Sequence, residues 1–306
     1  NVYALASVRL FTGLAAGTFS TCAIAYVGDY FPYERRGVAM SVVQAGYFAA
    51  LVFGVPVANL LAQWQGWRAS FALFGALAAA AFFLVAALLP EDRHLMAEHQ
   101  AESGSRSRFD GLRILFSSVE RVAAIAAAFL VSAGFVGFIF YLGSWLKGPL
   151  ELGANQVNLF FASVGVAALV GGLAAGPVAD RFGKRGLSIL STVMLALMLL
   201  LIPRLEWGAV LFLSFLIASL AFAFRQGPLQ ALATEMVPRN ARGAFVAVRN
   251  TASQIGIAVS TAVSGLLYNE AGYMAVGLFS GAVTLAAGIC IFLMREPVRE
   301  VIIDGE

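Results

Sequence analysis

Three arginines, Arg9, Arg225 and Arg249, lie inside long apolar runs of the sequence. A guanidinium stays charged in proteins and donates several hydrogen bonds, so each of these side chains could bind an anion or a polar group. A charge near the middle of a membrane is costly and normally faces a cavity or a partner. None of the 17 acidic residues and neither of the 2 histidines lies in the middle of an apolar run. The pattern therefore indicates recognition of a negative or polar group, without a buried proton-carrying acid.

Each arginine also has a structural interpretation. Arg9 could be tied to a backbone carbonyl, and Arg249 lies close enough to the end of its run for its charge to reach water. Arg225 is followed by Gln226, Gly227 and Pro228. A Gly-Pro pair weakens a helix and frees a carbonyl, so a binding site and a structural buttress are equally supported at this position.

A second group of charges forms a short segment, Gly176–Arg185, between two apolar runs. Gly176 and Gly183 predict a tight turn. The positive charges would hold this turn on one side of a membrane. A plain solvated loop would not need an acid and two glycines at this spacing, so we interpret the segment as a latch. Its charged members are Asp180, Arg181, Lys184 and Arg185.

The composition indicates an all-α polytopic membrane protein. Of 306 residues, 60% are hydrophobic and 12% are charged, with a mean hydropathy of +0.84. Backbone polar groups in lipid must bond within their own segment, which requires helices. The 2 cysteines and 2 histidines have no metal-ligand spacing, and no nucleophile–base pair or phosphate-binding loop is evident. We therefore expect no enzyme activity, no cofactor, no metal and no nucleic-acid partner.

Counting about 20 apolar residues per membrane span predicts nine helices. Basic residues predict their orientation, because 14 lie at one side of the spans and 3 at the other. The basic side, including the C-terminus, is then cytoplasmic and the N-terminus is outside. The polar stretch 91–117 is expected to be a cytoplasmic linker between 1–90 and 118–306. The expected spans are 3–28, 37–62, 68–89, 121–146, 154–179, 186–203, 207–235, 243–268 and 272–294.

An internal repeat links the two parts of the chain. Asp29–Gly37 and Glu235–Gly243 both read acid-x-x-Pro-x-x-x-Arg-Gly, 206 residues apart, at corresponding places in the predicted topology. Related halves of this kind recur in membrane carriers. At the same offset, a copy of the Gly176–Arg185 segment would lie before residue 1. We therefore expect twelve helices in two bundles, of which this sequence holds the last nine.

These motifs resemble the major facilitator superfamily, over the whole chain. Gly176–Arg185 is similar to that family's loop between the second and third helices of each half. Arg9 and Gly13 resemble its fourth-helix motif, and Asp29–Gly37 with Trp67-Arg68 match its fourth-to-sixth helix region. In the eleventh helix, the resemblance to drug/proton antiporters is carried by Asn250, Thr251, Gln254 and Gly256.

The resemblance implies two helical bundles. Residues 1–90 would form the last part of the N-terminal bundle, helices four to six, and residues 118–306 a complete C-terminal bundle of six helices. It implies a monomeric carrier in the cell membrane that works by alternating access. Efflux of organic compounds coupled to protons is the leading interpretation, and uptake or exchange of a small organic anion is the second. A membrane sensor or membrane-embedded enzyme is the alternative from another class. Without the first three helices, we expect no transport by the 306-residue chain itself.

The resemblance and the residue types together predict two sets of site residues. The substrate cavity is expected to contain Arg9, Gln44, Tyr47, Phe138, Tyr141, Arg225, Gln226, Asn250 and Gln254. The cytoplasmic gate is expected to contain Asp29, Arg36, Gly176, Asp180, Arg181, Gly183, Lys184, Arg185 and Glu235, with Arg181 or Lys184 pairing with Glu235.

Overall fold

The computed structural model describes residues 2–30, 43, 46, 49–88, 115–237 and 242–294. These residues are almost entirely helical, as the need to satisfy backbone groups within each apolar segment predicts. The elements are α1 (Val2–Tyr30), the π-helical turn η1 (Ala50–Gly54), α3 (Val55–Gln65), α4 (Trp67–Leu88), α7 (Val119–Lys147), α8 (Ala154–Phe182), α9 (Lys184–Leu201), the 3-10 turn η2 (Ile202–Arg204), α10 (Ala209–Glu235) and α11 (Arg242–Leu293).

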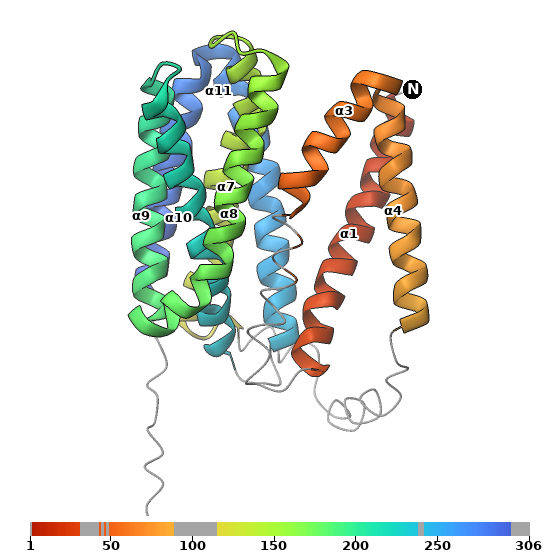
Figure 1. Ribbon diagram of the computed structural model, residues 1–306. Helices are drawn as coiled ribbons and strands as arrows, with labels where there is room; N and C mark the ends of the chain where they lie inside the picture. Colours follow the sequence, from red (N-terminus) through yellow and green to blue (C-terminus); the bar gives the residue numbers. More distant parts are fainter. Residues whose placement is uncertain are drawn as a thin grey trace, which may run out of the picture.

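The helices form two groups that lie side by side (Figure 1). The N-terminal group contains α1, α3 and α4, and the C-terminal bundle contains α7 to α11. Within the bundle, α7 packs along α11, whereas α10 packs against α8 and α9. The two groups meet where η1 and α3 contact α8, and where α1 contacts α11.

Six helices in the described part of the chain are long and apolar enough to cross a membrane. The last of them contains two of the spans predicted from the sequence, because α11 continues through both and bends at Gly272. Gly272 has φ 73, a conformation that glycine adopts without steric cost. The predicted total of nine spans stays a prediction, since part of the second expected span lies outside the described residues.

The buried side chains of the C-terminal bundle form two hydrophobic clusters. We call the end of the bundle that holds Gly183 and Glu235 the basic end and the opposite end, which holds Gly153, the far end. The far cluster is centred on Phe138, Phe160 and Phe215. The basic-end cluster contains Leu115, Leu232, Phe245 and Ile291. On α10 the far cluster ends at Ala223 and the basic-end cluster begins at Leu229, so the residues between them lie at the boundary of the two.

Candidate functional site: a buried arginine and an ion pair at the basic end

The turn between α8 and α9 is shorter than the sequence predicts. We expected the turn to include Gly176, but α8 continues through Pro177 as far as Phe182. The reversal is made by Gly183 alone, with φ 85, and α9 begins at Lys184. A continued helix keeps its backbone groups hydrogen-bonded where the chain leaves the apolar region, which explains why the helix persists past Pro177.

The charged side chains after this turn connect three helices. The Lys184 ammonium donates to the Glu235 carboxylate and forms an ion pair between the start of α9 and the end of α10. Arg185 donates to the backbone carbonyl of Phe292 near the end of α11, and its guanidinium lies 4.9 Å from the Phe292 ring centre. Of the two bases proposed as partners of Glu235, Lys184 forms the pair, whereas Arg181 lies 5.8 Å from the Phe182 ring centre. The role of these contacts as a gate stays a prediction.

Several predicted gate residues are placed only by their backbone. Asp29 lies in the last turn of α1 and Asp180 in the last turn of α8, but their side chains are outside the described part of the structure. Arg36 lies outside the described residues. Glu235 is the last residue of α10, three positions before Pro238, so the second copy of the repeat motif ends a helix as predicted.

Arg225 is the most unusual side chain of the bundle. It is 0% exposed, and none of the three nitrogens of its guanidinium has a hydrogen-bond partner among the described residues. It lies on α10 between the far cluster and the basic-end cluster. The Phe222 ring centre lies 5.7 Å from the guanidinium carbon, and the Phe222 ring stacks on Phe135 of α7 at 4.1 Å. A charge without a partner in such a place is costly.

Other polar atoms lie at a depth similar to that of Arg225. Ser132 of α7 and Ser253 of α11 share a hydrogen bond of 2.5 Å. The hydroxyls of Ser280 and Thr284, on the part of α11 after the bend, are buried and lack partners. By the helical rise of about 1.5 Å per residue, these positions lie at a similar depth from the basic end as Arg225. The middle of the bundle is therefore more polar than the clusters above and below it.

Close backbone packing of α7 on α11 was not predicted from the sequence. A side chain on Gly137 would collide with the Ser264 hydroxyl and would lie 2.7 Å from the Ser260 carbonyl oxygen. The Gly137 amide donates to the Ser260 hydroxyl at 3.0 Å, and that hydroxyl donates to the Ala133 carbonyl. Glycines and serines at spacings of three and four on both helices were the available signal, because small residues allow helices in membranes to approach closely.

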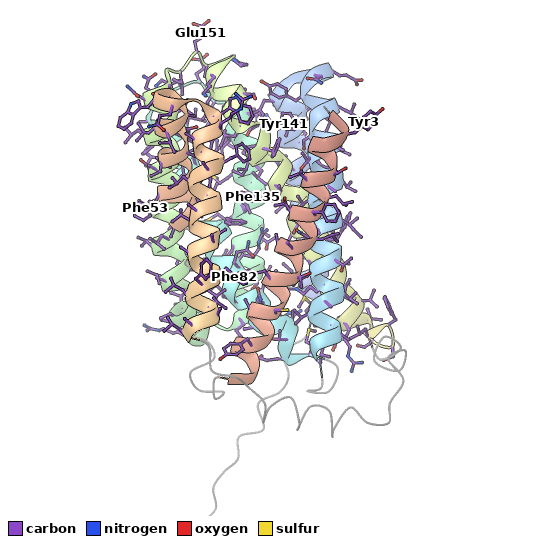
Figure 2. All side chains as sticks on the ribbon, turned by 90° about the vertical axis from the view of Figure 1, so that its right-hand side faces the viewer. Tyr3, Phe53, Phe82, Phe135, Tyr141 and Glu151 are labelled. Atoms are coloured by element: carbon purple, nitrogen blue, oxygen red, sulfur yellow. The ribbon has the colours of Figure 1, made fainter. Side chains whose placement is uncertain are left out.

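The predicted cavity residues fall into different environments. Phe138 is 1% exposed and packs on Phe215 and Tyr273 in the far cluster, so it belongs to the core. Tyr141 is half-buried and stacks on Tyr268 at 5.4 Å. In the view from the side of α3 and α4, the Phe135 and Tyr141 side chains are visible between the ribbons of α4 and α1 (Figure 2). Gln226 and Asn250 are half-buried and Gln254 is exposed.

Three other predicted cavity residues cannot be placed by their side chains. The backbone of Arg9 lies in α1, but its side chain is outside the described part of the structure. Gln44 and Tyr47 lie outside the described residues. Arg249, which we interpreted as structural, is half-buried seven positions after the start of α11.

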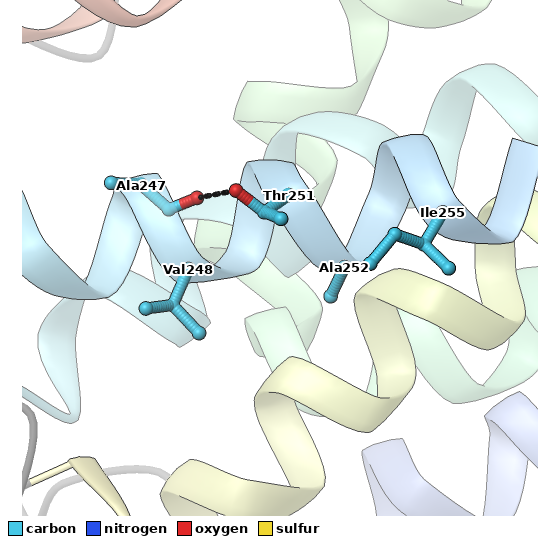
Figure 3. Close-up of a pocket in the computed structure, with 5 residues that line it drawn as sticks. All are labelled: Ala247, Val248, Thr251, Ala252 and Ile255. Atoms are coloured by element: carbon cyan, nitrogen blue, oxygen red, sulfur yellow. Dashed lines mark hydrogen bonds between the residues drawn. The ribbon is translucent and has the colours of Figure 1, made fainter.

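An open, shallow apolar pocket of about 310 Å³ lies on α11 (Figure 3). Its described lining is Ala247, Val248, Thr251, Ala252 and Ile255. The Thr251 hydroxyl donates to the Ala247 carbonyl at 3.0 Å, so the polar atom of this wall is already satisfied. At 100° per residue, this wall faces away from the side of α11 that packs on α7. The volume lies at the lower limit of pockets that hold small organic molecules.

A polar contact joins the two helix groups near the far end. The Asn59 side-chain amide of α3 donates to the Asn158 side-chain oxygen of α8 at 2.9 Å. Val52, in the π-turn η1 before α3, packs closely against α8. A side chain on Gly165 of α8 would lie 2.9 Å from Val52. π-turns are rare and are often found at functional sites. This contact lies at the opposite end of α8 from the Lys184–Glu235 pair.

Comparisons with known proteins agree on one family. The chain matches the Major Facilitator Superfamily over residues 1–153 and 143–305. It is 28% identical over 299 residues to the uncharacterized MFS-type transporter YwfA of Bacillus subtilis (strain 168). The matched region covers 93% of this chain and 68% of that relative. The chain is also similar in fold to the crystal structure of a D-xylose-proton symporter, with a TM-score of 0.68 and 20% identity over 89% of this chain and 67% of that one. The chain belongs to the Major Facilitator Superfamily and is an integral membrane protein of the secondary transporter class.

Proposed function

We propose that this protein exports small organic compounds across the cell membrane by alternating access, in exchange for protons. The observation that carries this proposal is the open apolar pocket on α11, about 310 Å³ in volume, in a chain of the transporter class. Its wall of Ala247, Val248, Thr251, Ala252 and Ile255 presents methyl groups and one satisfied hydroxyl. Such a surface suits apolar molecules better than heavily hydroxylated ones, because it offers few hydrogen bonds.

The ion pair at the basic end supplies the gate in this proposal. Lys184 and Glu235 join α9 to α10, and Arg185 ties α9 to the end of α11. Lys184 and Glu235 are each 27% exposed, so the pair is partly hydrated and contributes only about 0.2–1 kcal/mol. A contact of that size can be broken in each cycle. Asp180 lies two residues before the end of α8. Its carboxylate would accept hydrogen bonds from the N-terminal amides of a neighbouring helix and complete the gate.

The gate is tested by proton-driven flux through the full-length protein in proteoliposomes. We expect Asp180→Asn to lower export of an organic probe severalfold while binding from the far side persists, because the closed basic end loses its brace. Glu206→Gln, in an exposed outer loop, is the matched control and keeps normal flux. Unchanged flux for Asp180→Asn contradicts the gate. The gate is supported if Lys184→Glu or Glu235→Lys alone lowers flux and the double variant with exchanged charges restores it.

The same vesicles test direction and coupling. A gradient that is acidic on the far side must drive the probe out of the compartment that the basic end faces. If the gradient drives accumulation in that compartment, or has no effect while substrate on the opposite side accelerates flux, the protein is an uptake or exchange carrier. That second candidate, exchange of a small organic anion, is favoured by the buried cation Arg225.

A further inference from the structure

We infer that the transported compound is an amphipathic organic monoanion whose negative group is bound by Arg225. This inference rests on the proposed transport function and names the class of its substrate. Arg225 is 0% exposed, and in the described part of the chain none of its guanidinium nitrogens has a hydrogen-bond partner. Arginine cannot escape this cost by losing its proton, so the site requires a negative group from elsewhere.

The described acidic side chains do not supply that group. Glu235 is the acid closest in sequence on α10, ten residues away, or about 15 Å along the helix. Glu120 lies in the first turn of α7 and is therefore near the basic end. Glu151 and Glu206 lie in outer loops, and Glu270 lies two residues before the bend of α11. At the depth of Arg225, the described part of the bundle thus holds a cation without a matching anion.

The surroundings of Arg225 specify the rest of the ligand. The guanidinium is flanked by Phe222, and Phe222 stacks on Phe135. Below it on α10 are buried Pro228 and Leu229. One positive charge among aromatic and aliphatic side chains matches one carboxylate, or one sulfonate, attached to an apolar body. A dianion would leave one of its charges without a partner.

The local helix structure offers a route from the buried position to the ligand. Pro228 has no amide hydrogen, so the Phe224 carbonyl lacks its normal helical bond next to Arg225. Gly227 is exposed and has open space around it. These two residues weaken α10 at this point, so a small rotation of the helix can move the guanidinium past Phe222 toward Phe135. The Phe135 side chain is half-buried.

Binding to the purified full-length protein in nanodiscs tests the inference. The probes are benzoate, 2-naphthoate and octanoate, each compared with its neutral amide by calorimetry. We expect at least one carboxylate to bind tenfold or more tightly than its amide. Arg225→Gln should abolish that difference and leave amide binding unchanged, while Arg225→Lys should retain part of it. The matched control is Arg204→Gln, an exposed arginine that donates to the Leu200 carbonyl, and it should bind like the wild type.

Equal affinity for the carboxylates and the amides, no binding of any carboxylate, or an unchanged preference in Arg225→Gln would overturn the inference. So would saturation of the site by chloride alone, since that identifies a structural inorganic ion. If Arg225→Gln does not fold, the preference of the wild type and its competition by chloride still decide the matter. Carboxylate binding without flux would contradict the transport proposal alone, whereas flux of neutral compounds without carboxylate binding would contradict this inference alone.

Discussion

At the scale of single residues, Arg225 combines two properties that seldom occur together. It is fully buried, and its three nitrogens have no hydrogen-bond partners. Its contact with Phe222 at 5.7 Å contributes about 0.5–2 kcal/mol as a cation–π interaction, which is less than the several kcal/mol that burying a charge costs. The protein therefore gives up stability at this position, as binding sites commonly do.

Replacing Arg225 with methionine should stabilise the ligand-free protein. Methionine fills a similar apolar volume without a charge, and replacing buried ions with apolar side chains is often stabilising by about 1–4 kcal/mol. Thermal unfolding of the full-length protein in detergent, without added carboxylates, measures the effect. A large loss of stability in Arg225→Met would show that the guanidinium has a structural partner.

At the scale of elements, the bundle depends on the close approach of α7 to α11. Gly137 has no room for a side chain beside Ser260 and Ser264, and Gly134 has none beside Thr284. The Ser260 hydroxyl bonds to the backbone of α7 at two points. Because lipid offers no hydrophobic drive for helix association, tight packing and hydrogen bonds hold these helices together.

Gly137→Ala should destabilise the bundle by about 1–3 kcal/mol, because the added methyl group forces the two helices apart. Gly143→Ala is the matched control on the same helix, since nothing lies within 4 Å of the added group. The control should be neutral or stabilising by up to about 1 kcal/mol through helix propensity. Equilibrium unfolding of the two variants in detergent compares them, and equal stability would argue against the close contact.

At the scale of the whole molecule, contacts of different kinds hold the two ends. Near the far end, Asn59 of the N-terminal group bonds to Asn158 of the C-terminal bundle, and the π-turn places Val52 against Gly165. At the basic end, the ion pair of Lys184 and Glu235 stays within the bundle. A neutral hydrogen bond between two amide side chains is worth about 0.5–1.5 kcal/mol. A contact of this strength permits the two groups to separate and come together again.

Asn59→Leu should loosen the far end, because it removes this bond and leaves the Asn158 amide unpaired. Spin labels at the exposed positions Trp64 and Glu151, in a background without Cys22 and Cys290, report the separation of α3 and the loop before α8. The distance distribution should broaden and shift to longer values. Ser163→Ala is the control, since its hydroxyl bonds to the Leu159 carbonyl of its own helix. An unchanged distribution in Asn59→Leu would exclude a holding role for the pair.

Features that follow from local chemistry can be predicted from the amino-acid sequence. Apolar runs in a chain that is 60% hydrophobic determine helices, because lipid leaves the backbone no other partner. The residue pattern of the repeat and of the Gly176–Arg185 segment was sufficient to indicate the family and to propose Glu235 as the partner of a nearby base. The position of Arg225 inside an apolar run was also evident from the sequence.

Features that depend on contacts between distant segments became visible in the three-dimensional structure. In the structure Lys184, and not Arg181, is the partner of Glu235, because the reversal at Gly183 sets which side chain faces the end of α10. Phe138, expected in the substrate cavity, lies in the hydrophobic core. The sequence does not show whether a helix face lines a cavity or packs in the core until the neighbouring helices are known. The structure also revealed the Asn59–Asn158 bond and left Arg225 buried without a partner, and neither follows from residue spacing, because both depend on how separate helices pack in three dimensions.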